Sequence, residues 1–394
     1  MAGEGPRAVG RVALVWDDEL GSYDFGHGHP LAPVRVELTV ALIRELGLID
    51  GRRTIEVTPG SYDTDELLRL HRPDFVAAVQ RVSADPSVRA DWAHGLGPGD
   101  NPIFPGMHEA SMDVCAASKE AARLVWEGEA DHAFNPAGGL HHAMPDRAAG
   151  FCVYNDPAVA VDWLLEHGAQ RVCYLDVDVH HGDGVQEMFY DERRVLTVSL
   201  HESGRYLFPG TGDVSETGGQ GAEGSAANVP LHPGTTGDTW LEVFDEVITP
   251  LISSFAPDVL VTQLGCDTHA TDPLAHLALT LEDFRALATR IHRLAHEAAD
   301  GRWVALGGGG YQLVQVVPRA WTVFFAEMAG LPLPEDVPET WQRLATQRTG
   351  QRAPTSFRDG PVTVPDGVRE RSREAAREAA DALRRLVLPR HGAG

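Results

Sequence analysis

Short, continuously apolar runs alternate with longer stretches of mixed apolar and polar residues along most of the chain. The apolar runs are "RVALVW" from Arg11, "HAFNP" from His132, "RVCYLDV" from Arg171, "RVLTVSL" from Arg194, "DVLVTQLG" from Asp258 and "RWVALGGGG" from Arg302. Between them, the apolar spacing of helices occurs in residues 110–126, 157–167, 239–254 and 281–299. Strands that are continuously apolar are typically buried on both faces. The pattern therefore predicts an α/β fold, in which helices cover both faces of a central, mostly parallel sheet.

The character of the sequence changes after about residue 331. The stretches "LPLPEDVPET" and "RAPTSFRDGPVTVPDG" are rich in proline and turn residues, and residues 368–388 form an amphipathic pattern of mixed charge. We predict a C-terminal extension, residues 332–394, whose terminal helix packs on the main domain. The charged side of this helix is interpreted as a solvated face rather than a partner-binding surface.

Composition narrows the classes of function. The 394 residues include 33 basic and 57 acidic side chains, which gives a formal net charge of −24. Such a surface repels nucleic acid and anionic membranes, so neither is an expected partner. The four cysteines form no CxxC pair, and no apolar run is long enough for a membrane span or a secretion signal. We expect a reduced, cytoplasmic protein.

Polar clusters follow several of the predicted strands. They are Asp17-Asp18, "AGGLHHA", "DVHHGDG", "CDTHATDP" and "GGGGY". Ligands of open parallel sheets bind beyond the carboxyl ends of the strands. We therefore predict that several of these clusters converge on an active site at that edge of the sheet.

The stretch "YLDVDVHHGDG" carries the most specific signal. The two-residue spacing of Asp176, Asp178 and His180 places their side chains on one face of an extended segment. Two carboxylates and an imidazole that leave water together need a cation among them. We predict that Asp178 and His180 bind a metal with Asp267 as the third ligand, which leaves a position for water. Zn²⁺ and Fe²⁺ both suit this ligand set. A buried salt-bridge network is disfavoured because few basic side chains occur in these stretches.

Two further features predict catalysis. His141 and His142 follow a glycine-rich turn, and each imidazole could be oriented through Nδ1 by Asp176 or Asp183. Oriented imidazoles indicate acid–base chemistry. The glycines of "GGGGY" lack the spacing of a phosphate-binding loop. We interpret them as a turn that places the Tyr311 hydroxyl over the metal, where it could donate to an oxyanion.

Taken together, these stretches resemble the metal-dependent histone deacetylase superfamily, in particular its bacterial acetoin-utilisation branch and the class I enzymes. The resemblance runs from about Arg11 to Leu331. It rests on "HPLAPVR" from His29, "GDNPIFPG" from Gly99, "GGLHHAMPDRAAGFCVYND" from Gly138, "YLDVDVHHGDGVQEMF" from Tyr174, "TVSLH" from Thr197, "LFPGTGD" from Leu207, "QLGCDTHATDPLAHL" from Gln263 and "GGGGY". It implies a single arginase-like α/β domain, residues 11–331, that hydrolyses an acyl-lysine amide.

The resemblance also implies roles for individual residues. It pairs His141 with Asp176 and His142 with Asp183, and Tyr311 would polarise the acetyl carbonyl. Phe151 and Phe208 would face each other across a narrow substrate tunnel, with Gly150 alongside and Asp100 at the rim. Arg35, Gly138 and Gly139 would line an inner pocket for acetate. Leu274 and Gly309 would also contact the substrate. A structural K⁺ would bind carbonyls of Asp176, Asp178, His180 and Leu200 and the Ser199 hydroxyl. A second K⁺ site near Phe189 and Val195 is matched less well, because Glu192 and Ser225 depart from the usual pattern.

The implied reaction is attack of metal-activated water on the acetyl group of a lysine side chain in a protein or peptide. His142 is the favoured base, and the residue that protonates the departing amine is left open. An acetylpolyamine is the alternative substrate, disfavoured because no long dimer-forming insertion follows "YDFGHGHP". A two-metal ureohydrolase is disfavoured because Thr268-His269 follow Asp267 where a second DxD is expected. A non-catalytic binding module would not be expected to keep Tyr311 and both histidines.

Overall fold

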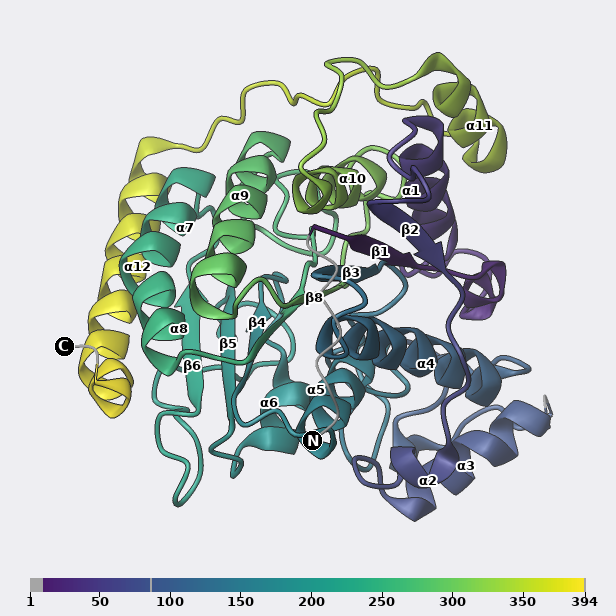
Figure 1. The fold of residues 1–394 in the computed structure, drawn as a ribbon, viewed down its shortest axis with the longest axis horizontal. Helices are drawn as coiled ribbons and strands as arrows, with labels where there is room; N and C mark the ends of the chain where they lie inside the picture. Colours follow the sequence, from purple (N-terminus) through teal and green to yellow (C-terminus); the bar gives the residue numbers. More distant parts are fainter. Residues whose placement is uncertain (1–9, 86, 393–394) are drawn as a thin grey trace.

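The computed structural model describes residues 10–85 and 87–392. In this part of the chain, eight strands form one sheet in the order β2-β1-β3-β8-β7-β4-β5-β6, and every neighbouring pair is parallel (Figure 1). The strands are β1 (Val12–Val15), β2 (Thr54–Val57), β3 (His132–Asn135), β4 (Val172–Asp176), β5 (Val195–Glu202), β6 (Ala226–Leu231), β7 (Val259–Gln263) and β8 (Trp303–Leu306). The predicted α/β fold with a parallel central sheet is confirmed.

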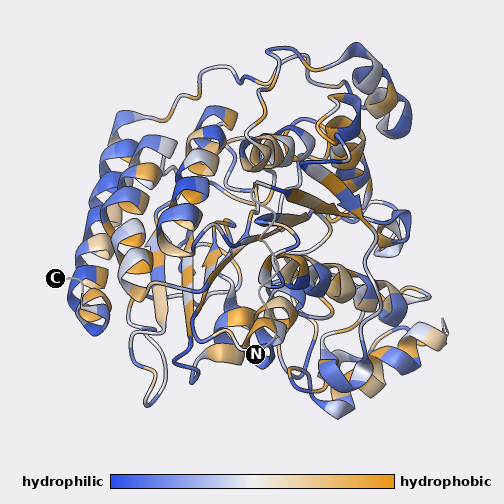
Figure 2. Cartoon of the chain, viewed as in Figure 1, coloured by the Kyte–Doolittle hydropathy of each residue, from blue (hydrophilic) through white to orange (hydrophobic). Residues whose placement is uncertain are grey.

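Helices cover both faces of this sheet (Figure 1). One face carries α4 (Met107–Trp126), α5 (Asp156–Glu166) and α6 (Asp183–Phe189), with α3 (Pro73–Ala84) packed on α4 and the short α2 (Thr64–Leu67) before it. The other face carries α1 (Val34–Glu45), α10 (Val317–Ala329), α9 (Leu281–Ala298), α8 (Thr249–Phe255) and α7 (Gly237–Val243). Figure 2 shows the expected hydropathy, with apolar strands in the centre and polar outer sides on α9 and α12. Apolar burial between these layers stabilises the fold.

The pattern of apolar runs did not predict two of the strands, β2 and β6, and both lie at the edges of the sheet. The run "TIEV" of β2 has polar residues at Thr54 and Glu56, and "AANVPL" of β6 contains a proline, so neither has the continuous apolar character of a central strand. The predicted helix at residues 239–254 is in fact α7 and α8, joined by a π-helical segment, Phe244–Ile248. Pro250, which has no N–H, lies in the first turn of α8.

The C-terminal extension packs on the sheet domain at two places. Trp341 of α11 (Glu339–Thr349) donates a hydrogen bond of 2.8 Å to the carbonyl of Leu38 in α1. Helix α12 (Asp366–Leu386) contacts β6 and α7, and Figure 1 shows it beside α7 at the outer edge. Its buried side is made of Ser372 and small or branched apolar side chains, and its other side is charged. The division of the chain near residue 331 stays a prediction.

All four cysteines are free and buried. Among the residues that the structure describes, no helix combines the length and apolar character needed to cross a bilayer.

Candidate active site

Four neighbouring strands, β3, β8, β7 and β4, end beside one another and carry the candidate site. The segments that follow them are residues 136–142, 307–311, 264–272 and 177–183. Because all four strands are parallel, their carboxyl ends meet at one edge of the sheet, where ligands of such folds bind. The predicted convergence of polar clusters is therefore found at this edge, with one exception described below.

Three side chains at this edge converge on one point. Nδ1 of His180 lies 3.1 Å from Oδ1 of Asp178 and 3.1 Å from Oδ2 of Asp267. All three side chains are buried, and their ligand atoms are close enough to share one metal ion. The sequence-predicted ligand set is thus assembled from the ends of β4 and β7.

Each carboxylate is held through its other oxygen. Oδ2 of Asp178 accepts hydrogen bonds from the Gln263 amide at 2.6 Å and the Gly309 N–H at 2.7 Å. Oδ1 of Asp267 accepts the Val179 N–H at 2.9 Å. The oxygen that faces His180 is therefore oriented in both cases, as supporting hydrogen bonds orient metal ligands elsewhere.

The electrostatics of this cluster fit a divalent cation. Among the described residues, no lysine or arginine forms an ion pair with Asp178 or Asp267; their ion-pair partners are histidines. Burial lowers the pKa of His180, but hydrogen bonds to both carboxylates outweigh it and raise the pKa to about 10. Burial and the charge of Asp178 raise the pKa of Asp267 to about 8. A divalent ion would supply the positive charge that these buried carboxylates lack.

Two glycines are required by the crowding around the ligands. A Cβ at Gly309 would lie 2.0 Å from Oδ2 of Asp267, and a Cβ at Gly265 would lie 2.1 Å from Oδ2 of Asp178. Any side chain at either position would displace a carboxylate. Gly309 thus supports the ligands directly, whereas its predicted role in substrate binding stays a prediction.

Two His–Asp pairs lie beside the candidate metal ligands. Nδ1 of His141 is 2.7 Å from Oδ2 of Asp176, and Nδ1 of His142 is 2.6 Å from Oδ1 of Asp183. The two imidazole rings are 4.0 Å apart between centroids, and all four side chains are buried. When one of these rings is neutral and its Nδ1 donates to the carboxylate, its Nε2 carries the lone pair. The pairing is the one that the sequence resemblance implied.

The two imidazoles differ in pKa. Burial and the neighbouring His141 lower the pKa of His142 to about 4, despite the charge of Asp183. Burial also lowers the pKa of His141, but Asp176 and Asp178 outweigh it and raise the pKa to about 9. Paired groups with separated pKa values are typical of sites that need both a base and an acid. At neutral pH, His142 has the unprotonated state of a base.

Aromatic side chains stand around the approach to these groups. Phe208, with 44% of its surface exposed, packs edge-on against His142 at 4.9 Å between ring centroids. Phe151 packs edge-on against Tyr311 at 5.7 Å. A Cβ at Gly150 would lie 2.5 Å from the His142 ring and 2.9 Å from the Phe208 ring. Gly150 therefore leaves room for the rings of His142 and Phe208, which a side chain at this position would displace.

The backbone at Phe151 is fixed by a residue that the sequence did not single out. Phe151 has a φ of 70°, a conformation that non-glycine residues rarely adopt. The buried hydroxyl of Tyr23 donates to the Phe151 carbonyl at 2.8 Å and accepts the Val153 N–H at 3.0 Å. These two hydrogen bonds stabilise a conformation that costs about 1–3 kcal/mol.

Tyr311 directly follows the glycine turn of residues 307–310, and a hydrogen bond fixes its backbone. Its N–H donates to Oδ2 of Asp272 at 2.8 Å. Burial, together with the charges of Asp267 and Asp178, holds the pKa of its hydroxyl well above the usual value. The phenol therefore keeps its proton and can donate a hydrogen bond in the site.

Arg35 lies behind the same glycine turn. It is buried and donates to the carbonyls of Gly308 at 2.7 Å and Gly310 at 3.3 Å. Its Nε has no hydrogen-bond partner among the described residues. A Cβ at Gly139 would lie 2.6 Å from the carbonyl carbon of Gly307, so these two turns pack backbone to backbone.

Gly138 contacts a second buried carboxylate. A Cβ there would lie 2.4 Å from Oδ2 of Asp156. This oxygen accepts the Gly139 N–H at 3.0 Å, and Oδ1 of Asp156 accepts the Leu140 N–H at 2.8 Å. Asp156 thereby fixes the turn that precedes His141. The roles of Asp156 and Gln263 were not predicted from the sequence. The available signal was a polar residue within a mostly apolar, buried segment.

Some predicted residues lie apart from this centre. Asp17 caps the 3₁₀ helix Asp18–Ser22 through its side chain, and Asp18 accepts from Trp16, so the first polar cluster is structural. Asp100 is exposed, and Leu274 is half-buried in the loop held by Asp272.

The predicted K⁺ ligands lie on neighbouring strands. Asp176 and Ser199 face each other in the β4–β5 register, and the Ser199 hydroxyl lies 2.9 Å from Nδ1 of His201. Leu200 follows in β5 and is buried. Binding of K⁺ at this place or near Phe189 and Val195 stays a prediction.

Comparison with known proteins agrees with this geometry. The sequence profile of the "Histone deacetylase domain" matches residues 29–328. This chain belongs to the histone deacetylase family. It is 37% identical over 378 residues to the "Acetoin utilization protein AcuC" of Bacillus subtilis (strain 168), which covers 94% of this chain and 97% of the relative. The protein of the same name from Staphylococcus aureus (strain MRSA252) is 36% identical over 330 residues, 82% of this chain and 83% of the relative.

Solved structures of the histone deacetylase family have the same fold. The crystal structure of an HDAC homologue from Aquifex aeolicus covers 94% of this chain and 100% of its own, with a TM-score of 0.80 and 29% identity. An HDAC homologue in complex with SAHA matches with a TM-score of 0.81 at the same identity and coverage. The predicted superfamily and its acetoin-utilisation branch are thus confirmed, and the chain is a deacetylase-family hydrolase. Metal dependence in this family agrees with the cluster of Asp178, His180 and Asp267.

Proposed function

We propose that this hydrolase removes acetyl groups from the ε-amine of lysine in proteins or peptides. The observation that carries the proposal is the position of the His142–Asp183 pair beside the converging ligand atoms of Asp178, His180 and Asp267. The arrangement places an oriented, unprotonated imidazole next to a cation site, which is what hydrolysis of an unactivated amide requires. The relatives' name supports a role in acetoin utilisation, and we place the reaction in the cytoplasm.

Zn²⁺ is the proposed metal, with Fe²⁺ as the alternative, held by Asp178, His180 and Asp267. When bound, a divalent ion polarises the acetyl carbonyl and lowers the pKa of water that it binds. His142 accepts the proton of the attacking water at Nε2, and Asp183 stabilises the resulting imidazolium through Nδ1. His141, positioned by Asp176, is the proposed donor to the departing amine. Tyr311 donates its hydroxyl hydrogen to the carbonyl oxygen as negative charge develops there.

The residues around the proposed catalytic groups support a substrate whose amine stands on a long methylene chain. Phe151 and Phe208, with Gly150 between Phe208 and His142, offer aromatic surface to the methylenes of a lysine side chain. Asp100 is exposed at the surface, where we propose that it accepts backbone N–H groups of the substrate. Arg35, with an Nε that has no partner among the described residues, supports an inner acetate pocket beside Gly138 and Gly139. Leu274 and Gly309 complete the proposed substrate contacts, and K⁺ at the carbonyls near Ser199 and Leu200 remains part of the proposal.

An acetylpolyamine also presents an acetyl amide on a methylene chain, so the two substrate classes must be compared directly. The experiment measures acetate released by the purified, metal-loaded protein from an acetyl-lysine peptide and from acetylspermidine. We expect kcat/KM for the peptide to be at least about tenfold higher. A preference for acetylspermidine would favour the alternative, and release from neither substrate would overturn the proposed activity.

A further inference from the structure

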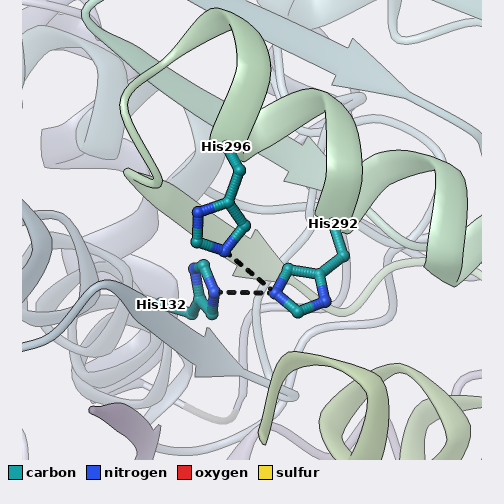
Figure 3. Close-up of side chains that lie close together, drawn as sticks. All are labelled: His132, His292 and His296. Carbon is teal, nitrogen blue, oxygen red and sulfur yellow. Dashed lines mark hydrogen bonds between the residues drawn. The ribbon is translucent and has the colours of Figure 1, made fainter. Parts of the chain in front are cut away.

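Three histidines meet at the edge of the sheet opposite the active site. His132 is the first residue of β3 and pairs in register with Trp303, the first residue of β8. His292 and His296 lie one helical turn apart near the end of α9, the helix that leads into β8. Since the strands are parallel, their amino ends lie at the edge away from the catalytic residues. Figure 3 shows the three imidazoles pointing toward one another, two from the helix and one from the strand.

The distances between the ring nitrogens are close to those between the nitrogen ligands of a single metal ion. Nε2 of His292 lies 3.2 Å from Nε2 of His132 and 3.1 Å from Nε2 of His296. One nitrogen from each of the three rings lies within 4.8 Å of the other two. Tetrahedral coordination with Zn–N bonds of about 2.0–2.1 Å separates ligand nitrogens by about 3.3 Å. The sidechains therefore already stand close to the spacing that one ion requires.

Hydrogen bonding between the rings accounts poorly for this arrangement. Nε2 of a neutral imidazole has either one hydrogen or one lone pair. Nε2 of His292 therefore cannot make two well-formed hydrogen bonds, to His132 and His296, at the same time. A metal ion removes this conflict, because all three Nε2 atoms then present lone pairs to it.

A carboxylate supports the central histidine from its other side. Oε1 of Glu327, on α10, lies 3.6 Å from Nδ1 of His292. A carboxylate on the Nδ1 side of a histidine favours the tautomer whose Nε2 lone pair is available to a metal. Glu327 therefore supports His292 as a metal ligand, in agreement with the convergence of the three rings.

We propose that His132, His292 and His296 bind a second divalent transition-metal ion, of the kind that imidazole ligands favour, with Zn²⁺ as the physiological choice. His132 is buried, whereas His296 is exposed, so solvent completes the coordination. The ion would join the end of α9 to the start of β3 and stabilise the folded chain. The inference does not depend on the proposed function.

The test is a Zn²⁺ titration, at pH 7.5, of tag-free protein that has been stripped with a chelator. We expect two ions per chain for the wild type and one for His296→Ala, with acetate release by the zinc-loaded variant unchanged. Arg293→Ala, an exposed change in the same turn of α9, is the matched control and should bind two ions. Equal stoichiometry in the wild type and His296→Ala would overturn the proposal.

Two further variants separate this site from the catalytic one. Glu327→Gln should weaken binding of the second ion about 10–100-fold, the usual effect of losing a carboxylate that supports a histidine ligand. Asp178→Asn should lose the catalytic ion and keep the ion at His132, His292 and His296. If Asp178→Asn left no bound zinc, the second site would be refuted even though the catalytic site stood.

Discussion

Nδ1 of His142 lies 2.6 Å from Oδ1 of Asp183, while the ring of the same histidine stacks edge-on against Phe208 and beside His141. One imidazole is thus oriented by a carboxylate, kept neutral by burial and by its neighbour, and placed against Phe208. The first prediction concerns this residue.

His142→Ala should lower kcat for acetate release at least about 10²-fold, because the reaction loses its general base. Zinc content should stay at the wild-type level, since His142 is not a ligand in the proposed cluster. Steady-state kinetics together with elemental analysis check both statements. Normal turnover in this variant would refute the proposed role.

Tyr311→Phe removes one hydroxyl and leaves the ring that packs against Phe151. We expect kcat to fall about 10²–10³-fold with little change in KM, because the hydrogen bond is made as charge develops on the carbonyl oxygen. A rise in KM at constant kcat would instead assign Tyr311 to ground-state binding.

Gly309→Ala should abolish zinc binding at the catalytic site, because the added Cβ would lie 2.0 Å from Oδ2 of Asp267. Gly60→Ala is the matched control, since no atom lies within 4 Å of its added Cβ and its backbone does not have a positive φ. Metal titration of the two variants provides the comparison. Wild-type zinc affinity in Gly309→Ala would show that the ligands are less tightly placed than we describe.

We predict that the buried imidazole of His71 makes the stability of the fold sensitive to acid. Its Nδ1 lies 3.0 Å from the Met144 carbonyl, its Nε2 accepts the Asn155 N–H at 3.1 Å, and burial lowers its pKa to about 4. The folded pKa lies below the unfolded value of about 6.5, so protonation favours the unfolded chain. The stabilisation is complete above pH 6.5 and is lost as the pH falls towards 4, a change of about 3 kcal/mol.

Urea unfolding of chelator-treated protein at pH 7.5 and 4.5 checks this prediction. His71→Gln should be much less stable than the wild type at pH 7.5, and the gap between their midpoints should shrink at pH 4.5. His27→Gln, at an exposed position, serves as the control. A gap that is independent of pH would contradict the argument.

Local spacing made part of the site predictable. Asp178 and His180 are two residues apart beyond a buried strand, so their shared face follows from strand geometry alone. The position of Asp267 beside them follows from the parallel pairing of β4 and β7. Asp17 and Asp18 also follow a strand, yet they cap a short helix, because the same polar residues satisfy backbone N–H groups there.

Other parts depend on contacts that no local pattern contains. Tyr23 fixes Phe151 from 128 positions away in the sequence, and Gln263 holds Asp178 across two strands. The histidines of α9 are visible as "HRLAH", but their meeting with His132 requires the three-dimensional fold. Such long-range pairs need the structure, because sequence distance gives no information on which side chains meet.

The most direct test is restoration of activity to metal-free enzyme, measured as acetate release from an acetyl-lysine peptide. His296→Ala is the suitable background, since it removes the second proposed site. We predict no acetate release after chelation, full recovery at one equivalent of Zn²⁺ or Fe²⁺ per chain, and no recovery when Asp178→Asn is added. Acetate release at the full rate by protein without detectable metal would contradict the account.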